Sequence, residues 1–383
     1  MSVLEELEPL RSRLAGLGRP HTPADVAAAM RAEGRVVSDA ALIETLDLLH
    51  RHSVGAGPLE ALLTTPGVTD VLVNGPDHVY VDRGRGLELT PVRFGSDAEV
   101  RRLAQRLAAS VGRRLDDAVP FVDARLADGS RVHAVLGTLA DPGTCISLRV
   151  PASRSFSLDD CVASGSLTPG AAELLGRVVR ARLAFLISGG TGTGKTTLLA
   201  ALLALVPPNE RIVVVEDSRE LAPRHPHVVR MEGRPANAEL AGAVTLTDLV
   251  RQSLRMRPDR LVVGEVRGGE IADLLTAMNT GHEGGCGTVH ANSSADVPAR
   301  LEALAALGGL SRHALHAQVA SALHASVHIV RDDQGRRRVS EVSVFTRDDA
   351  SGLTRTEQAV VFGPDGRTRL GPGSGRLERL LDR

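Results

Sequence analysis

The spacing of hydrophobic residues changes along the chain. In residues 1–62, apolar positions recur every three or four residues in "LEELEPLRSRLAGL" and "DAALIETLDLLHRH", which predicts a helical segment. Beyond it, β-branched residues gather in short runs, including "VTDVLVNG", "HVYVDRG" and "CISLRV", which predict strands. Between these runs, "DAEVRRLAQRLAASVGRRL" has helical spacing and "FVDARLADGSRVHAVL" has the pattern of a hairpin. Residues 63–150 are therefore expected to form an α+β domain.

The second half of the chain alternates short apolar strands with helices. The strands "LAFLISG", "RIVVVED", "RLVVGEV" and "GTVHAN" are separated by segments of helical period. Apolar strands that alternate with helices indicate a parallel sheet covered on both faces, so residues 171–348 are predicted to be an α/β domain. Its last part, "SVHIVRDDQGRRRVSEVSVF", has the pattern of a hairpin. Residues 151–170 and 349–383 are rich in Gly and Pro, and are expected to be a linker and a loosely held tail.

Composition and charge narrow the class of protein. A chain of 383 residues is expected to form two or three domains. A formal net charge of −1, six Phe, one Tyr and no Trp argue against nucleic acid or an anionic membrane as a direct partner. Cys145, Cys161 and Cys286 are far apart and odd in number, so neither a disulfide framework nor a four-cysteine zinc site is expected. The charged N-terminal sequence, with no long apolar run anywhere, predicts a cytoplasmic protein whose membrane contact is peripheral.

One segment carries a nucleotide-binding motif. "GGTGTGKT", residues 189–196, fits G-x-x-x-x-G-K-[ST] and lies between a predicted strand and a predicted helix. The glycines of such a loop let backbone N–H groups turn inward around phosphate oxygens. Its lysine reaches the β- and γ-phosphates and the next hydroxyl binds Mg²⁺, so we assign these roles to Lys195 and Thr196. The expected nucleotide-binding residues are Gly190, Thr191, Gly192, Thr193, Gly194, Lys195, Thr196 and Thr197.

Lys195 is also the only lysine in the chain. All the remaining residues of the Lys and Arg class are arginine. A compact ammonium fits between phosphates where a planar guanidinium would fit badly. The guanine-specifying motif N-K-x-D needs a second lysine, so the sequence excludes this form of GTP recognition. ATP is therefore the favoured nucleotide.

Two predicted strands end in acids. "RIVVVEDSREL" ends its strand at Glu216 and Asp217, and "RLVVGEV" ends at Glu265. The carboxyl ends of parallel strands face the ligand crevice, so these acids are expected beside the phosphate loop. ATP hydrolysis needs a carboxylate to orient or deprotonate water, and Glu216 and Glu265 are the candidates. Gly264 stands where the usual second-strand motif has aspartate. The alternative for each glutamate is a helix cap.

Two histidines follow in "TGHEGGCGTVHANS". The glycines around Cys286 leave the backbone free to approach another group closely. No metal-ligand spacing links His282 and His290 to this cysteine, so zinc is not expected. A histidine near a γ-phosphate can sense it by hydrogen bonding, which makes His290 a candidate sensor. A buried structural histidine is the alternative.

The order of these motifs resembles the Walker A, Asp box, Walker B and His box of the type II/type IV secretion ATPase superfamily. The segments are the phosphate loop, "VVVEDSREL", "LRMRPDRLVVGEVRGGE" and "NTGHEGGCGTVHAN". Upstream, "VTDVLVNGPDHVYVDR", "VGRRLDD" and "DARLADGSRV" are similar to the CpaF-like tight-adherence (Tad) pilus ATPases of that superfamily. The likeness covers about residues 58–330.

The resemblance implies a homo-hexamer whose subunit has a PAS-like N-terminal domain and a RecA-like ATPase domain, with ATP between them and Mg²⁺ as cofactor. Glu216 and Glu265 would activate water and His290 would sense the γ-phosphate. Arg131 and Arg149 match N-terminal-domain arginines that reach the nucleotide. The possible additional site residues are Asp217, Arg255, Arg257, Arg267 and His282. The four-cysteine zinc module of GspE-like members is missing, and Arg219, within the Asp box, has no assigned role.

The function expected on these grounds is ATP hydrolysis that powers pilus assembly or protein secretion through inner-membrane platform proteins. A conjugation-type type IV secretion ATPase or a pilus-retraction ATPase is the alternative within the superfamily. A nucleic-acid translocase on the same core is opposed by the near-zero charge and the few aromatic residues. An assembly component with negligible ATP turnover is a third possibility.

Overall fold

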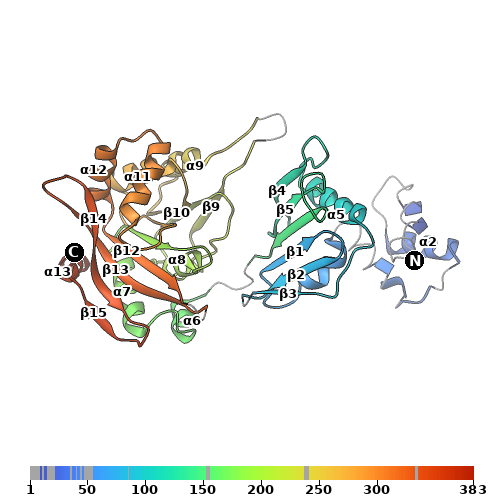
Figure 1. Ribbon diagram of the computed structural model, residues 1–383, viewed down its shortest axis with the longest axis horizontal. Coiled ribbons are helices and arrows are strands. Elements are labelled where there is room, and N and C mark those ends of the chain that lie inside the picture. The colour runs from blue at the N-terminus through green and yellow to red at the C-terminus, as the bar shows by residue number, and fades with distance from the viewer. Residues whose placement is uncertain are drawn as a thin grey trace. The chain divides into compact units, whose positions relative to one another are not determined.

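The computed structural model forms two compact units, residues 1–152 and 153–383, each of which is described by itself (Figure 1). The boundary falls close to residue 150, where the sequence pattern changes. The structure describes residues 9–10, 13–14, 22–34, 37–39, 41–43, 45–46, 55–84, 86–151, 156–236, 241–332 and 335–383.

An antiparallel sheet is the centre of the first unit. Within the described residues its six strands lie in the order β3-β2-β1-β6-β5-β4. Helix α5 (Asp97–Ser110) packs Leu103 and Leu107 into the same core as Val71 and Ile146 of the sheet. The α+β class expected for this part of the chain is confirmed. The strands are β1 (Asp70–Asn74), β2 (His78–Asp82), β3 (Leu87–Leu89), β4 (Phe121–Arg125), β5 (Arg131–Val135) and β6 (Cys145–Arg149).

The described part of the N-terminal segment contains helix α2 (Pro23–Ala32). Its N-cap, Thr22, and Asp25 form a reciprocal capping box, which satisfies two N–H groups at the start of the helix. Short helices η1 (Gly57–Leu59) and α4 (Glu60–Leu63) precede the sheet. The two helices predicted from "LEELEPLRSRLAGL" and "DAALIETLDLLHRH" lie largely outside the described residues.

The second unit is built on a larger sheet. Within the described residues its nine strands lie in the order β15-β14-β13-β12-β7-β11-β10-β8-β9. Neighbours from β12 to β9 are parallel, and β13, β14 and β15 extend the sheet in antiparallel fashion. The strands expected from sequence are β7 (Phe185–Gly189), β8 (Ile212–Glu216), β10 (Arg260–Val266), β11 (Cys286–Val289) and the hairpin of β12 (Ala325–Arg331) and β13 (Arg337–Arg347). The half-buried β9 (Val228–Glu232) was not expected.

Helices cover both faces of this sheet (Figure 1). Successive residues of a strand point to opposite faces, so Ile187 and Leu186 of β7 belong to different cores. The core on one face includes helices α7 (Pro169–Arg180) and α8 (Lys195–Leu203). The other core includes α9 (Leu246–Ser253), α10 (Glu270–Asn279), α11 (Val297–Leu307) and α12 (Arg312–Ala322). The predicted doubly covered parallel sheet is confirmed, and it brings the carboxyl ends of β7, β8, β10 and β11 to one edge.

The linker expected at residues 151–170 is only partly a linker. Its second half forms helix α6 (Leu158–Ala163) and joins the core of the second unit through Leu158, Cys161 and Leu167. The helix begins at a capping box. The N–H of Asp160 donates to the hydroxyl oxygen of Ser157, and the N–H of Ser157 donates to the carboxylate of Asp160. The sequence "SLDD" contains this capping pattern, but it was missed because the segment around it is rich in Ser and Gly.

The prediction of a loosely held tail at residues 349–383 is wrong. These residues form β14 (Thr354–Phe362), β15 (Thr368–Leu370) and helix α13 (Ser374–Leu381). The Gly- and Pro-rich sequence between the two strands makes the turn of a hairpin. Helix α13 then buries Leu377 and Leu380, three residues apart, in the core of the second unit. Burial of this amphipathic face holds the C-terminal segment in place.

Candidate nucleotide-binding and catalytic site

The phosphate loop connects β7 with α8. Gly189 has a positive φ of 153°, and a Cβ atom there would lie 2.4 Å from the carbonyl oxygen of Ile329, so only glycine fits. Gly194, the N-cap of α8, is in the left-handed conformation. The hydroxyl of Thr193 donates to the carbonyl of Gly190 at 2.9 Å, which closes the loop on itself. The loop therefore presents the first N–H groups of α8 to an anion.

Lys195 lies buried beneath this loop, with 7% of its surface exposed. Its Nζ donates to the carbonyl oxygens of Gly189 at 3.1 Å and Gly190 at 2.7 Å. Burial lowers the pKa of Lys195, and the nearby carboxylate of Glu265 acts in the opposite direction. The single lysine is thus placed at the loop, as its motif predicted.

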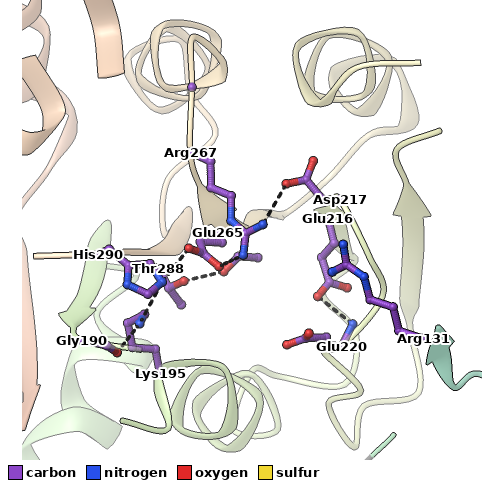
Figure 2. A network of polar contacts seen from close by, with 12 residues as sticks. Arg131, Gly190, Lys195, Glu216, Asp217, Glu220, Glu265, Arg267, Thr288 and His290 are labelled. Carbon is purple, nitrogen blue, oxygen red and sulfur yellow. Dashed lines mark hydrogen bonds and ion pairs between the residues drawn. The ribbon is translucent and has the colours of Figure 1, made fainter. Parts of the chain in front are cut away.

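Glu265, at the end of β10, is the centre of a polar network (Figure 2). One carboxylate oxygen lies 2.8 Å from Nε2 of His290, which lies 3.4 Å from Nζ of Lys195. The other accepts a hydrogen bond from Nη2 of Arg267 at 2.7 Å, and Nη1 of Arg267 lies 3.8 Å from Asp217. Residues predicted from three different motifs therefore lie with Lys195 in one cluster: Asp217, Glu265, Arg267 and His290.

The charges of this cluster set its protonation states. Burial by itself would raise the pKa of Glu265, but pairing with Arg267 and the charges of His290 and Lys195 outweigh it and lower this pKa. Burial, assisted by the charge of Lys195, lowers the pKa of His290. At neutral pH, Glu265 is therefore a carboxylate and His290 a neutral imidazole that can donate to it.

Glu216, at the end of β8, has a different environment. It is 4% exposed, and one carboxylate oxygen accepts hydrogen bonds from the backbone N–H groups of Glu220 at 3.0 Å and Leu221 at 2.9 Å. Figure 2 shows the side chain turned toward Glu220 and away from Lys195. The other oxygen is buried without a hydrogen-bond partner, and burial raises the pKa of Glu216 to about 7 against the effect of the two N–H groups. Glu216 holds the Asp-box loop, residues 216–221.

The position of Glu216 explains the glycine at 264. Strands β8 and β10 are parallel neighbours, and a Cβ atom at Gly264 would lie 2.5 Å from Cγ of Glu216. An aspartate there is excluded by the same clash, because the space is filled by the glutamate of the adjacent strand. The carbonyl of Gly264 in turn accepts from the buried hydroxyl of Thr288 at 2.7 Å.

Other predicted site residues lie apart from this network. The ring of His282, which follows helix α10, lies 3.3 Å from the carbonyl oxygen of Ala277 in the last turn of that helix. Arg255 and Arg257 are exposed, and neither is among the described partners of Glu265 or Lys195. Arg219, to which the sequence assigned no role, donates to Glu232 of β9 at 2.9 Å and so ties the Asp-box loop to the sheet edge.

Arg131 and Arg149 belong to the first unit. They stand directly opposite each other on β5 and β6, so their side chains share one face of that sheet. Arg131 pairs with Asp123, and Arg149 donates to Asp70 at 3.1 Å. Each arginine is therefore paired with a carboxylate of the same sheet.

A pocket of about 230 Å³ lies beside the phosphate loop, within the second unit. Thr193, Gly194 and Thr197 line one side of it. The other walls come largely from the segment that was expected to be a linker, and from β12 and β13. They include Phe156, Leu167, Ile329, Arg337 and Val339. Sequence reasoning missed this pocket, because its apolar lining comes from segments far apart in the chain.

Comparison with known proteins places this chain in a family. Residues 52–370 match the family model described as "Type II/IV secretion system protein". A Mycobacterium tuberculosis protein named "Putative conjugal transfer protein" is 56% identical over 316 residues, which cover 81% of this chain and 90% of that protein. The conjugal transfer protein TrbB of Rhizobium radiobacter is 32% identical over 275 residues, covering 70% and 81% of the two chains.

Solved structures agree at the level of the fold. The pilus retraction motor PilT with bound ADP has a TM-score of 0.52 and 20% identity, covering 74% of this chain and 81% of that one. The ATPase DotB of Yersinia pseudotuberculosis has a TM-score of 0.53 and 16% identity, covering 91% and 87%. The chain therefore belongs to the type II/IV secretion system protein family. It is an ATP hydrolase of that family, with a RecA-like ATPase domain. No helix among the described residues is both long and apolar enough to cross a membrane.

Proposed function

We propose that this ATPase is a hexameric motor that powers pilus assembly of the Tad type, or protein secretion, at the inner face of the cytoplasmic membrane. The observation that carries the proposal is the network of Lys195, Glu265 and His290 at the end of the phosphate loop. Inner-membrane platform proteins are the proposed partners. The upstream segments that resemble Tad ATPases support this branch of the family.

In this proposal Glu265 is the carboxylate that orients and deprotonates the attacking water. Its ionised state at neutral pH leaves it able to accept a proton, and His290 holds one of its oxygens in place. The neutral ring of His290 lies between Glu265 and Lys195, where it can report a change at the γ-phosphate to the catalytic carboxylate. Arg267 holds the other oxygen of Glu265 and links it to Asp217.

The donor set beside the loop fits Mg²⁺. Thr196, in the first turn of α8, supplies one hydroxyl, and Mg²⁺ takes few protein ligands because it keeps water and phosphate oxygens. When bound, the metal would neutralise charge on the phosphates. Arg131 and Arg149 are proposed to contact the nucleotide, and in the structure they bond to the carboxylates of Asp123 and Asp70 on one face of their sheet.

The pocket beside Thr197 is proposed to hold the adenine base. Its volume of about 230 Å³ and its apolar walls of Leu167, Ile329 and Val339 suit a flat aromatic ring. Phe156 and Arg337 supply faces on which a base can stack.

The test of the motor site is ATP turnover by Lys195→Arg. The longer planar head keeps the charge but misplaces its donors, so this variant is expected to lose most of its turnover. Arg369→Lys, the reverse exchange at an exposed position on β15, is the control and should keep wild-type turnover. Wild-type turnover in Lys195→Arg would contradict the role of this lysine.

A conjugation-type type IV secretion ATPase is the second candidate, because curated relatives of this chain carry names of conjugal transfer proteins. Deleting the gene distinguishes the two. Loss of surface pili with normal DNA transfer supports the first proposal, and loss of DNA transfer with normal pili supports the second.

A further inference from the structure

His328 is a buried histidine next to the phosphate loop that none of the motifs includes. It is 5% exposed and lies on β12, directly opposite Ser188 of β7 in the parallel ladder. Ser188 is fully buried and precedes Gly189, the first residue of the loop. Its Oγ lies 2.9 Å from Nδ1 of His328. The imidazole is thus bonded to the strand that leads into the phosphate loop.

The same ring also reaches the segment that follows the candidate sensor. The backbone of Asn292, two residues after His290, lies near the ring and raises the pKa of His328. Ser188 itself also pairs in the sheet with Val289, the residue before His290. We call residues 290–292 the sensor segment. The ring of His328 is therefore bonded to Ser188 at the place where the strand before the phosphate loop pairs with the strand that leads to His290.

The neutral imidazole fits these surroundings. With its hydrogen on Nε2, Nδ1 accepts from the hydroxyl of Ser188. Burial lowers the pKa of His328, and the charge of Lys195 acts in the same direction while Glu341 and Asp296 oppose it. The neutral ring with this tautomer is the form that fits the site near neutral pH.

We propose that His328 is a positioning residue for ATP hydrolysis. It fixes the sensor segment relative to the strand before the phosphate loop, so that His290 keeps its contact with Glu265. The inference rests on the proposed role of Glu265 and His290. A shift of the sensor segment would move His290 relative to both Glu265, at 2.8 Å, and Lys195, at 3.4 Å. A small displacement of a catalytic group is enough to slow a reaction strongly.

The chain offers a matched histidine with a structural environment. His316 is 4% exposed, its Nδ1 accepts from the N–H of Thr354 at 3.0 Å, and its Nε2 lies 3.3 Å from Glu302. It is as buried and as bonded as His328, but its partners lie on α11 and β14 and not at the phosphate loop. Replacing each histidine by asparagine separates loss of stability from loss of positioning.

The experiment measures kcat, KM for ATP and Tm for His328→Asn, His328→Gln and His316→Asn. Asparagine places a polar atom near the position of Nδ1 but is too short to reach the backbone of Asn292, whereas glutamine extends to the position of Nε2. We expect His328→Asn to lose about tenfold in kcat with KM changed less than about twofold, and His328→Gln to recover most of that loss. His316→Asn should lower Tm and leave kcat unchanged below its unfolding temperature.

Ser188→Ala gives an independent test if asparagine at 328 does not support folding. It removes the hydroxyl that fixes Nδ1 and should lower kcat without weakening nucleotide binding. Equal kcat in wild type, Ser188→Ala and both His328 variants overturns the inference, even if their Tm values fall. Absence of turnover in the wild type, or full turnover in Glu265→Gln, instead overturns the proposed catalytic site on which it rests.

Discussion

The carboxyl ends of β8 and β10 each carry a glutamate, and the two side chains have opposite environments. Glu265 is half-buried among Arg267, His290 and Lys195, which lower its pKa. Glu216 is almost fully buried, accepts two backbone N–H groups of its own loop, and has a pKa raised to about 7. A position at the end of a parallel strand therefore does not define a role. The partners of each carboxylate support the proposal that Glu265 is the catalytic residue, and they show that Glu216 positions the Asp-box loop.

The largest effect is expected for Glu265→Gln. The amide keeps the size of the side chain but cannot accept a proton from water, so turnover should fall by about 100-fold or more. Nucleotide affinity, measured by titration with a fluorescent ATP analogue, should change little. Glu357→Gln, at a surface ion pair with Arg355 on β14, is the control for loss of a carboxylate. Equal turnover in both variants contradicts the assignment.

The close packing of Glu216 against β10 can be disrupted at Gly264. In Gly264→Ala the added methyl group meets Cγ of Glu216 at 2.5 Å, and such overpacking is expected to lower the free energy of unfolding by about 1–3 kcal/mol. Glu216→Ala in the same chain should recover part of this loss, because it removes the atoms that clash. Gly170→Ala, where the added Cβ meets nothing within 4 Å, is the matched control. Additive losses in the double variant would show that the clash is not the cause.

Glu216→Gln tests the raised pKa of Glu216 through the pH dependence of stability. The folded state binds the proton of Glu216 more tightly than the unfolded state, with pKa values of about 7 and 4.5. Its contribution to stability is therefore complete below about pH 4.5 and is lost as the pH rises through about 7, a change of roughly 3 kcal/mol. Glutamine does not titrate, so the free energy of unfolding of wild type relative to the variant should fall over this pH range. Parallel urea-unfolding profiles of the two proteins would contradict the raised pKa.

The smallest effect is expected for Arg219→Ala. The ion pair of Arg219 with Glu232 is partly exposed, and pairs of this kind contribute about 0–1 kcal/mol. Turnover should fall by less than in Glu265→Gln, since the Asp-box loop keeps its two bonds to Glu216. A loss of turnover as large as that of Glu265→Gln would mean that this arginine has a catalytic role.

The sequence predicted most of the fold, because its local patterns carry the information. The apolar runs of β7, β8, β10 and β11 and the phosphate-loop motif each occupy a short continuous segment. The helix after Ser157 and the C-terminal hairpin were missed because Gly, Pro and Ser were interpreted as signs of a linker and a loosely held tail, although here they form a capping box and a turn. Burial of Leu377 and Leu380 depends on a distant sheet that local composition does not reveal.

The site was predictable in its residue types but not in its contacts. The motifs predicted that Lys195, Glu265 and His290 lie close together, and the structure shows these contacts because all three residues lie at one edge of a parallel sheet. Sequence could not show that Glu216 turns toward its own loop, because that direction depends on backbone N–H groups at Glu220 and Leu221. The departure at Gly264 was visible, but its cause is a side chain on the neighbouring strand. His328 was missed because its partners come from β7 and from the segment after β11.

The most direct test of this division of roles is ATP turnover by wild type, Glu265→Gln and Glu216→Gln, measured side by side at saturating ATP and neutral pH. We expect Glu265→Gln to lose nearly all turnover and Glu216→Gln to keep most of it, because an amide can still accept hydrogen bonds from the Asp-box loop. Loss of turnover in Glu216→Gln with retention in Glu265→Gln would contradict the proposed roles of the two glutamates.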